Sequence, residues 1–558
     1  MMKYIFIVGG VMSGVGKGVA TASIGKIIQS KGFEVTAVKI DPYVNIDAGT
    51  MNPTEHGEVF VLDDGMECDQ DMGNYERFLD RDLSSANYMT TGSVYLSVIN
   101  RERSLEYGGK CVEVVPHIPL EIIDRINSAA KKEKAEIVVV EIGGTVGEYQ
   151  NILFLEAIRM LKIKKQKDVA LALVSYLPQQ GIGGELKTKP TQYAVRTLNS
   201  AGLQPDIILA RAGQPLDEKR KNKIAFNCNM AGEAVISAPD VESIYDIPVN
   251  FEKDNLSGIL LKKLYLKARK KDLVEWKKLA AKIKRAEQAV KIGIVGKYFS
   301  TGSFVLADSY ISVIEALKHA AYSLGKKPEI HWIDSGDFEI GNNLKKLKEY
   351  GGIVIPGGFG SRGVEGKINA IKYIRENKIP FLGLCYGMQL AVIEYGRSVA
   401  GFKKAHTTEV NPSAPEPLID ILPEQKKNLK IKNFGATMRL GAYPAIIKEG
   451  TIAHSAYKNS SLEIKDKKLR EKFGLNADDL LIFERHRHRY EVNPFYIDNL
   501  EEKGLVFSGI SPDQRLMEIL ELPKTKHPFF AATQFHPEFK SRPLKPHPLF
   551  REFIKIAK

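Results

Sequence analysis

The chain has 558 residues, which is too long for one compact core and predicts two to four domains at about 150 residues each. Its composition, 44% hydrophobic and 26% charged, is that of a globular chain, and no apolar run approaches the roughly 18 residues of a membrane span. Disordered and membrane-spanning proteins are therefore excluded. The net charge of +13 favours anionic partners, namely phosphorylated small molecules, nucleic acid or a membrane surface.

The four cysteines, Cys68, Cys111, Cys228 and Cys385, lie far apart in the sequence. They do not form the close pairs that are typical of metal sites and disulfide scaffolds, so reduced thiols are expected. The N-terminal residues run directly into the apolar stretch 4–8, which is too short for a secretory signal and lacks a small-residue cleavage site. We therefore expect a cytoplasmic protein.

Short apolar runs alternate with helix-like segments through the first half of the chain. The run 3–8 ends in a pair of glycines, and residues 17–29, which follow the glycine-rich turn, have a helical pattern. Further strands are expected at 34–40, 137–142, 169–174 and 207–210, and further helices at 121–134 and 151–161. This alternation indicates a doubly wound α/β domain with a parallel sheet, which we assign to residues 1–265.

A basic stretch, which we place at residues 266–290, separates this domain from a second one. Lysine and arginine recur there among leucine, alanine and Trp276, as is typical of a solvated helical connector, and a nucleic-acid-binding arm is the alternative. Beyond it, strands are expected at 291–295, 329–333, 352–355 and 380–384, and a helix at 365–377. Residues 291–558 are therefore expected to form a second doubly wound α/β domain.

A glycine-rich loop, Gly9 to Gly18, joins the first expected strand to the first helix. It is nearly a P-loop, in which backbone N–H groups and a helix N-terminus bind phosphates while a lysine, here Lys17, neutralises charge. The loop is one residue longer than usual, and Gly18 stands where a serine or threonine would ligate Mg²⁺. Carboxylates elsewhere must then hold the metal, and candidates are the run Asp69 to Asp71 and Glu141. A turn that only packs the helix on the sheet is the alternative.

The second domain places a cysteine in the setting of a nucleophile elbow. An apolar strand leads through the run Gly383 to Gly387 into a helix, and small residues flank Cys385 because a sharp turn has to expose its side chain. The helix N-terminus behind the sulfur favours the thiolate. His536 and Glu538, at the end of another expected strand, are able to point the same way and to serve as base and orienting group. Backbone N–H groups near Gly358 and after the cysteine are candidates for the oxyanion hole, and a buried packing cysteine is the alternative.

Together these sites resemble the CTP synthase family, and the resemblance covers essentially all 558 residues. The elbow cysteine and the His-Pro-Glu run are similar to any class I glutamine amidotransferase and indicate only the ammonia donor. The specific signatures lie in the first domain, at 41–43, 49–51, 56–60, 141–147 and 187–192. The resemblance implies a P-loop-like synthase domain of the dethiobiotin-synthetase type, followed by an amidotransferase domain. It implies amination of UTP to CTP in pyrimidine biosynthesis, driven by ATP and supplied by glutamine.

The resemblance also implies a set of residues for each ligand. ATP would be bound by Gly14, Val15, Gly16, Lys17, Gly18, Val19, Lys39, Asp71, Pro239, Asp240 and Val241. UTP, or CTP as feedback inhibitor, would contact Ser13, Glu148, Tyr149, Gln150, Lys187, Thr188, Lys189, Pro190, Thr191, Gln192 and Lys223. Glutamine would be held by Gly358, Tyr386, Gly387, Met388, Gln389, Glu409 and Arg489. Mg²⁺ would be held by Asp71 and Glu141, and the catalytic residues would be Cys385, His536 and Glu538.

Further expectations concern partners and regulation. The family's oligomers are tetramers, so the resemblance implies a homotetramer acting on small molecules, without nucleic acid or membrane as partner. It also implies a sheltered ammonia channel with residues 56–59 in its lining, and GTP as an allosteric activator of glutamine hydrolysis. By composition alone the run Arg485 to Tyr490 would be a basic surface strand or an RNA patch.

The chain departs from the family pattern at several positions. The run Glu148 to Gln150 replaces the usual Asp-Ile-Glu, so an amide stands where a carboxylate is expected near the nucleotide. Pro239 replaces a lysine on the adenine side, and Tyr386 replaces a leucine after the catalytic cysteine. In the segment expected to respond to GTP, Ser104 replaces an arginine and Gly108 a leucine. Weaker CTP feedback and weaker GTP activation are therefore expected.

Two other functions remain as alternatives. An amidotransferase related to the cobyric acid or dethiobiotin enzymes would share the altered P-loop, but the run Lys187 to Gln192 argues against it. A filament-forming or RNA-binding scaffold with inactive sites would show a broken triad or P-loop, and both are intact. UTP-dependent release of ADP would distinguish the first alternative from the CTP synthase reaction.

Overall fold

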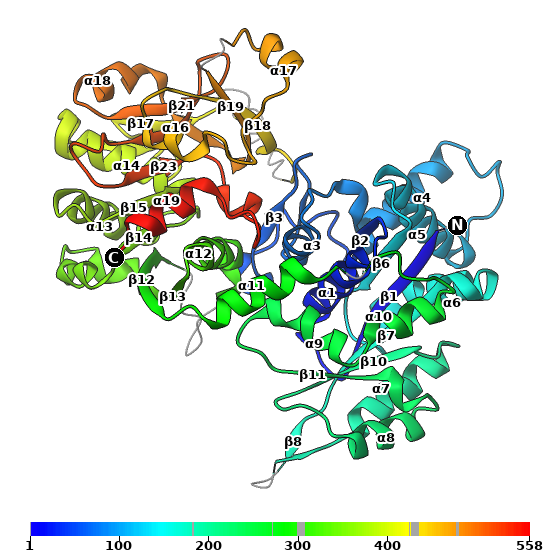
Figure 1. The fold of residues 1–558 in the computed structure, drawn as a ribbon. Coiled ribbons are helices and arrows are strands. Elements are labelled where there is room, and N and C mark those ends of the chain that lie inside the picture. The colour runs from blue at the N-terminus through cyan, green and yellow to red at the C-terminus, as the bar shows by residue number, and fades with distance from the viewer. Residues whose placement is uncertain are drawn as a thin grey trace. The chain divides into compact units, whose positions relative to one another are not determined.

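The computed structural model describes residues 2–180, 184–270, 272–297, 307–422, 425, 435–475 and 479–558. Contacts group the chain into two compact units, the first made of residues 1–48 and 71–281 and the second of 49–70 and 282–558 (Figure 1). A short segment from the N-terminal half of the sequence thus packs with the C-terminal half. Within the described ranges, every helix is too short or too polar to cross a membrane.

The first unit is built on a seven-stranded parallel sheet in the order β11-β10-β7-β1-β6-β2-β5. Its strands are β1 (Lys3–Gly10), β2 (Val35–Asp41), β5 (Tyr88–Thr90), β6 (Ile137–Ile142), β7 (Val169–Tyr176), β10 (Ile207–Ala212) and β11 (Val235–Pro239). The central strands are buried along their whole length, as their runs of valine, isoleucine and leucine require. The predicted parallel α/β fold is confirmed.

Helices pack with this sheet, and the last of them lies within the basic stretch 266–290. They are α1 (Lys17–Ser30), α3 (Asp71–Leu79), α4 (Thr91–Arg103), α5 (Val114–Lys132), α6 (Ile152–Lys164), α7 (Lys189–Ser200), α8 (Glu218–Asn227), α9 (Ile247–Lys253), α10 (Leu256–Lys263) and α11 (Val274–Lys284). Trp276 of α11 is buried against Phe78 and Tyr245, and its Nε1 donates a hydrogen bond to the Tyr245 carbonyl at 2.8 Å. One apolar side chain therefore anchors the basic helix to the first unit.

The second unit contains a nine-stranded mixed sheet in the order β13-β12-β14-β15-β23-β22-β21-β18-β19. Its strands are β12 (Gln288–Gly296), β13 (Lys326–Asp334), β14 (Gly352–Ile355), β15 (Phe381–Leu384), β18 (Arg439–Ile447), β19 (Leu480–His488), β21 (Val506–Ile510), β22 (Met517–Glu521) and β23 (Phe530–Thr533). The part from β13 to β23 is parallel, which confirms the predicted α/β character, and the remaining pairs are antiparallel. The antiparallel part was not predicted.

Three helices of this unit carry residues at or near the cavity beside Cys385. They are α12 (Ile311–Ser323), α13 (Val364–Glu376) and α14 (Tyr386–Tyr395). The second and third of these pack on the core around β14 and β15, where Ile371, Ile374 and Leu390 are fully buried. A small separate sheet is formed by β16 (Ala405–Thr407), β17 (Glu416–Ile421) and β20 (Tyr490–Val492).

The segment 49–70 forms a short helix, α2 (Pro53–His56), and a hairpin of β3 (Val59–Val61) and β4 (Glu67–Asp69). Two arginines of β19 hold this hairpin. Arg485 Nε donates to Asp63 Oδ1 at 2.5 Å, and Arg487 Nε donates to Glu67 Oε1 at 2.8 Å. The basic run that composition alone would assign to a surface strand or an RNA patch is thus occupied by contacts inside the unit.

Candidate active site

The glycine-rich loop lies between the end of β1 and the start of α1. Gly14 and Gly16 have φ angles of +67° and +86°, a region that favours glycine. Lys17 opens the helix, and its Nζ donates a hydrogen bond to the Gly144 carbonyl at 2.9 Å. Burial lowers the pKa of Lys17, and the charge of Glu141 opposes this effect. The predicted strand, turn and helix are therefore present, with the lysine at the helix N-terminus.

The position of Gly18 explains why this loop has no hydroxyl. A Cβ atom built on Gly18 would lie 1.7 Å from Oδ1 of Asp71, so a larger residue at this position would require the Asp71 carboxylate to move. In an ordinary P-loop a serine or threonine at this point would ligate Mg²⁺. Here the carboxylate of Asp71, at the start of α3, occupies that space instead.

Three carboxylates surround a lysine beside this loop. Nζ of Lys39, on β2, lies 2.7 Å from Asp71 Oδ2, 3.0 Å from Glu141 Oε1 and 3.5 Å from Asp41 Oδ1. The Tyr75 hydroxyl donates a hydrogen bond to Glu141, and burial raises the pKa of that carboxyl. Among the described residues, no three His, Cys, Asp or Glu side chains form a complete metal cage. Asp71 and Glu141, the two residues predicted for Mg²⁺, offer the carboxylate oxygens that this hard cation prefers.

A cavity of about 280 Å³ adjoins the loop in the first unit. Five of the residues predicted for ATP line it, namely Gly16, Val19, Pro239, Asp240 and Val241. Arg211 also lines it and was not predicted; it forms an ion pair with Asp240 and donates a hydrogen bond to the Val15 carbonyl at 3.1 Å. Arg211 could have been predicted from its position near the carboxyl end of β10, because parallel α/β sheets bind ligands at that edge.

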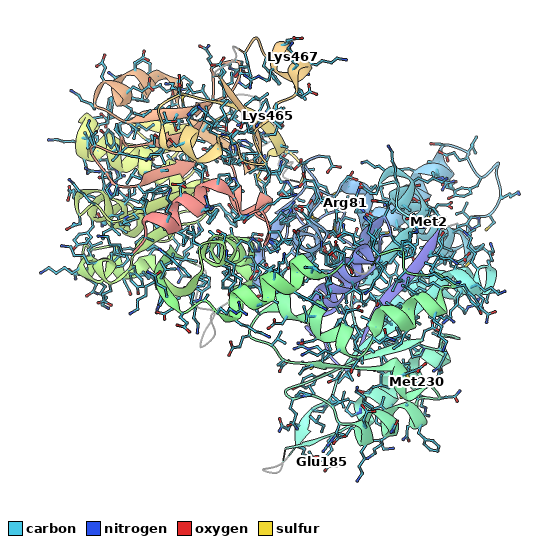
Figure 2. All side chains as sticks on the ribbon, viewed as in Figure 1. Met2, Arg81, Glu185, Met230, Lys465 and Lys467 are labelled. Carbon is cyan, nitrogen blue, oxygen red and sulfur yellow. The ribbon has the colours of Figure 1, made fainter. Side chains whose placement is uncertain are left out.

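The residues predicted for UTP and CTP follow neighbouring strands. Ser13 follows β1, residues 148–150 follow β6, and residues 187–192 follow β7, and these three strands are adjacent in the sheet. Glu185, labelled in Figure 2, is exposed on β9 (Glu185–Leu186) and accepts a hydrogen bond from Lys187 Nζ at 2.6 Å. The charge of Lys223, on α8, also acts on Glu185. Lys187 and Lys223, which are both predicted to contact UTP, therefore lie near one another.

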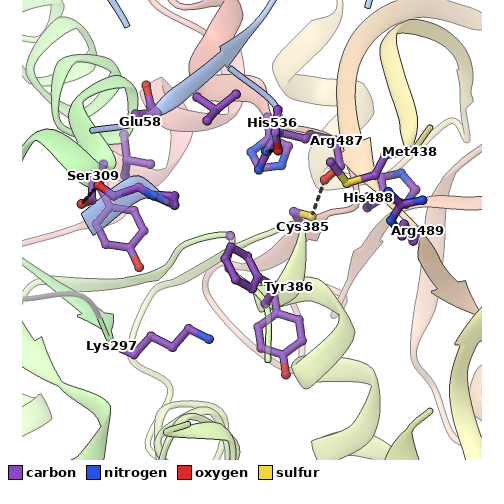
Figure 3. Close-up of a pocket in the computed structure, with 18 of the residues that line it drawn as sticks. Glu58, Lys297, Ser309, Cys385, Tyr386, Met438, Arg487, His488, Arg489 and His536 are labelled. Atoms are coloured by element: carbon purple, nitrogen blue, oxygen red, sulfur yellow. Dashed lines mark hydrogen bonds between the residues drawn. The ribbon is translucent and has the colours of Figure 1, made fainter. Parts of the chain in front are cut away.

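In the second unit, Cys385 stands alone between β15 and α14 as predicted. Its φ and ψ of +49° and −99° are rare for a residue other than glycine, as expected for a nucleophile elbow. Its N–H donates to the Thr533 carbonyl at 2.7 Å. Its sulfur lies 3.8 Å from the Arg487 carbonyl oxygen, the dashed contact in Figure 3, and 3.6 Å from Gln534 Nε2. The strained turn thus fixes the direction of the sulfur.

His536 and Glu538 follow β23 in a short turn, so their pairing does not depend on strand alternation. Nδ1 of His536 lies 2.7 Å from Oε1 of Glu538. A Cβ atom on Gly357 would lie 2.9 Å from Cε1 of His536 and 3.7 Å from Cβ of Cys385, so both side chains lie over this glycine. Burial disfavours the charged imidazole, but Glu538 and Cys385 outweigh it and raise the pKa of His536 to about 10. The ring is therefore an imidazolium at neutral pH.

A cavity of about 1040 Å³ opens at the sulfur (Figure 3). Among the residues predicted for glutamine, those that line it are Gly358, Tyr386, Gln389, Glu409 and Arg489. Gly387 and Met388 do not line it; the side chain of Met388 is fully buried in the core. Residues 49–53, 58 and 59 complete the wall; the resemblance implied 56–59 for an ammonia channel, and 49–53 were not predicted for this cavity.

Other residues of this cavity were also missed from the sequence. Lys297, just after β12, lines the cavity, and burial lowers its pKa to about 8. Glu409 accepts a hydrogen bond from the Gly360 N–H at 2.7 Å, and burial raises the pKa of its carboxyl. A cavity with a carboxylate, a guanidinium and a lysine offers charges of both signs, which suits a zwitterionic amino acid. The only feature of the sequence that could have identified Lys297 is its position directly after an apolar strand.

The two units carry complementary chemistry: a phosphate-binding loop with acidic neighbours in one, and a cysteine elbow with a histidine–glutamate pair in the other. This combination defines an ATP-using ligase with a class I glutamine amidotransferase unit. Models of known families match the same two regions, "CTP synthase N-terminus" over residues 3–266 and "Glutamine amidotransferase class-I" over residues 305–556.

Relatives match over the whole chain. A CTP synthase of Pyrococcus furiosus is 51% identical over 560 residues, covering 100% of this chain and 98% of its own length. One from Halalkalibacterium halodurans is 47% identical, covering 100% and 99%. A solved structure, the glutaminase domain of Trypanosoma brucei CTPS with bound acivicin, is 35% identical and covers 48% of this chain and 93% of its own, with a TM-score of 0.41. The chain belongs to the CTP synthase family. It is a ligase that aminates UTP to CTP in pyrimidine biosynthesis, with ATP and glutamine as substrates.

Proposed function

We propose that Cys385, His536 and Glu538 hydrolyse glutamine. The sulfur attacks the amide carbon, and the imidazolium of His536 gives its proton to the leaving nitrogen, so that ammonia and a glutamyl thioester form. His536 then accepts a proton from the water that hydrolyses the thioester to glutamate. The backbone N–H groups of Gly358 and Tyr386 stabilise the oxyanion in both steps. The observation that carries this proposal is the position of His536, charged by Glu538 and next to the sulfur.

Glutamine is held by charge in this proposal. Glu409 receives its α-ammonium group, and Arg489 receives its α-carboxylate, since both side chains line the cavity at the sulfur. Tyr386 and Gln389, at the start of α14, line the same cavity and position the amide. Ammonia is released into a cavity whose wall includes Glu58 and Val59, which supports the expectation that residues 56–59 line its route.

For the synthase reaction, we propose that the loop residues 14–19 bind the ATP phosphates and that Lys17 and Lys39 neutralise them. Asp71 and Glu141 would hold Mg²⁺, which when bound spreads the charge of the transferring phosphoryl group. The 4-oxygen of uracil is a poor leaving group, so ATP phosphorylates it, and ammonia then displaces phosphate. Residues 239–241 and the 280 Å³ cavity accommodate the nucleoside of ATP. Ser13, residues 148–150 and 187–192, and Lys223 hold UTP.

Spectrophotometric conversion of UTP to CTP, measured with glutamine and with or without ATP, tests the two halves of the proposal together. Synthesis that requires both substrates supports it, and synthesis without ATP contradicts it. We also propose a homotetramer, on the family pattern, and a cytoplasmic location, because all four cysteines are free thiols and Cys385 has to be reduced to act. Sedimentation of the full chain with its nucleotides tests the tetramer.

We propose CTP as a feedback inhibitor whose effect is weakened by Gln150. Its Nε2 donates a hydrogen bond to Glu148 Oε2 at 2.6 Å, so one carboxylate with an amide partner stands where the family pattern has two carboxylates. The variant Gln150→Glu is expected to be inhibited more strongly by CTP than the wild type. Inhibition constants measured for both proteins at one UTP concentration check this. Equal constants would show that the amide serves as well as the carboxylate.

We propose GTP as an activator, with weak coupling of roughly fivefold to tenfold in the glutaminase rate. Ser104 cannot pair with a phosphate, and Arg101 cannot easily replace the missing arginine because it already binds Glu106 at 2.9 Å and Glu121 at 2.8 Å. The flexible Gly108 makes a closed loop entropically costly. Glutaminase rates measured against GTP check the coupling.

The matched variants for this prediction are Ser104→Arg alone and Ser104→Arg with Gly108→Leu. Both are expected to increase activation by GTP. The single variant is needed because Gly108 has a φ of +62°, which a leucine rarely adopts. Strong activation of the wild type that neither variant increases would contradict the prediction.

A further inference from the structure

Lys367, on α13, has a buried charge that the known reaction does not use. Its side chain is 0% exposed, and within the described part of the chain its Nζ has no hydrogen-bond partner. Burying an ammonium group without a partner strongly disfavours the charged form and destabilises the fold. Such a group is retained at a cost in stability, which points to a role in function.

The position of this lysine is close to the proposed oxyanion hole. Its Nζ lies 5.5 Å from the centre of the Tyr386 ring, and Tyr386 is the residue after the catalytic cysteine. A Cβ atom on Gly358 would lie 4.0 Å from the same Nζ. The hydroxyl of Tyr386 donates to the Gly360 carbonyl at 3.1 Å, which fixes the ring. The ammonium therefore lies close to both residues whose backbone N–H groups are proposed for the oxyanion hole.

Among the residues that the structure describes, few negative charges lie near the Lys367 ammonium group to stabilise its positive charge before the reaction begins. Burial lowers the pKa of Lys367 to about 7, and the nearby Lys297 lowers it further, while Asp334 at the end of β13 opposes them. Arg375, about two turns further along α13, forms a bidentate ion pair with Glu394 of α14 and so adds no net charge. The charge on Lys367 thus has little to stabilise it before the reaction begins.

We propose that Lys367 is a positioning residue of the glutaminase site, whose buried charge acts through Tyr386 and Gly358 to stabilise the oxyanion formed when Cys385 attacks glutamine. The proposal rests on the proposed function of Cys385. In a dry site a charge interacts strongly with an anion that develops nearby. Because the anion exists only in the reaction, the gain accrues to the transition state and not to bound glutamine.

The test replaces Lys367 by methionine, which has a similar length and no charge. The variant Lys367→Met is expected to lose about tenfold in kcat for glutamine hydrolysis, less than the loss of a direct oxyanion donor. The KM for glutamine and the rate with added ammonium salt are expected to stay unchanged. Its unfolding temperature is expected to equal or exceed that of the wild type, since a buried charge is removed. The control is Lys372→Met, an exposed lysine on the same helix, with no effect expected.

The pH profile separates this role from a packing role. In the wild type, kcat/KM for glutamine hydrolysis is expected to fall as pH rises through about 7, where Lys367 loses its proton. In Lys367→Met this inflection is expected to vanish. An unchanged kcat and profile in the variant would overturn the proposal, as would an equal loss of ammonia-dependent activity or a lower unfolding temperature.

The same assay with Cys385→Ala keeps the two proposals distinguishable. Glutamine hydrolysis by Cys385→Ala would refute the assigned nucleophile and the inference that rests on it. If Cys385→Ala is inactive and Lys367→Met behaves as the wild type, only the role of Lys367 is refuted.

Discussion

Replacement of Cys385 by alanine is expected to abolish glutamine-dependent CTP synthesis, by roughly 10⁴-fold or more, and to leave synthesis from added ammonium salt unchanged. No other residue of the elbow, Gly383 to Gly387, carries a thiol, so only Cys385 can form the thioester there. The synthase residues lie in a different compact unit and need only ammonia. Parallel assays with glutamine and with ammonium salt check the prediction.

The matched control is Cys228→Ala. Cys228 is also buried, but it lies in the first unit, where burial raises the pKa of its thiol to about 11 and makes it unreactive. Its variant is expected to retain both activities. If Cys385→Ala lowered the ammonia-dependent rate as much as the glutamine-dependent rate, the division of labour between the units would be refuted.

The second large effect is expected at the acidic cluster beside the phosphate loop. Asp71→Asn and Glu141→Gln are each expected to lower both glutamine- and ammonia-dependent synthesis by about 10²- to 10³-fold, because each weakens Mg²⁺ at the phosphoryl transfer step. The loop offers no hydroxyl in compensation, since Gly18 is held against Asp71. Steady-state rates over a range of Mg²⁺ concentrations check this, and thermal unfolding verifies that the variants fold.

Asp41→Asn provides the comparison within the same cluster. Asp41 lies farther from Lys39 Nζ, at 3.5 Å, and a smaller loss is expected there. Glutamine hydrolysis by itself is expected to survive in all three variants, since its residues lie in the second unit. Substantial CTP formation by Asp71→Asn or Glu141→Gln at ordinary Mg²⁺ would refute the metal assignment.

Much of the fold was predictable because buried parallel strands consist of continuous apolar runs in the sequence. The strands at 137–142 and 352–355 have the predicted bounds, and the helix expected at 365–377 forms from 364 to 376. The antiparallel part of the second sheet was missed. β19 carries the run from Glu484 to His488, in which charged and polar residues are buried by ion pairs instead of apolar contacts, and no hydropathy pattern reveals that.

The site was predictable where chemistry depends on a local motif. The elbow at Cys385 and the His536–Glu538 pair are local, and their residues lie together as expected. The contacts that complete the site are not local. Lys367 reaches Tyr386 only because α13 packs on α14, and a lysine on a helix is normally taken as exposed.

The hairpin of residues 59–69 has a consequence for biosynthesis of the chain. Asp63 leaves the ribosome 422 residues before its partner Arg485, so this pairing closes only after nearly the whole chain has emerged. Until then the thiol cavity lacks β19 and the turn that bears His536, although the first unit is already complete in sequence. A nascent chain therefore carries the sequence of the whole first unit before all the residues proposed for glutamine hydrolysis have been synthesised.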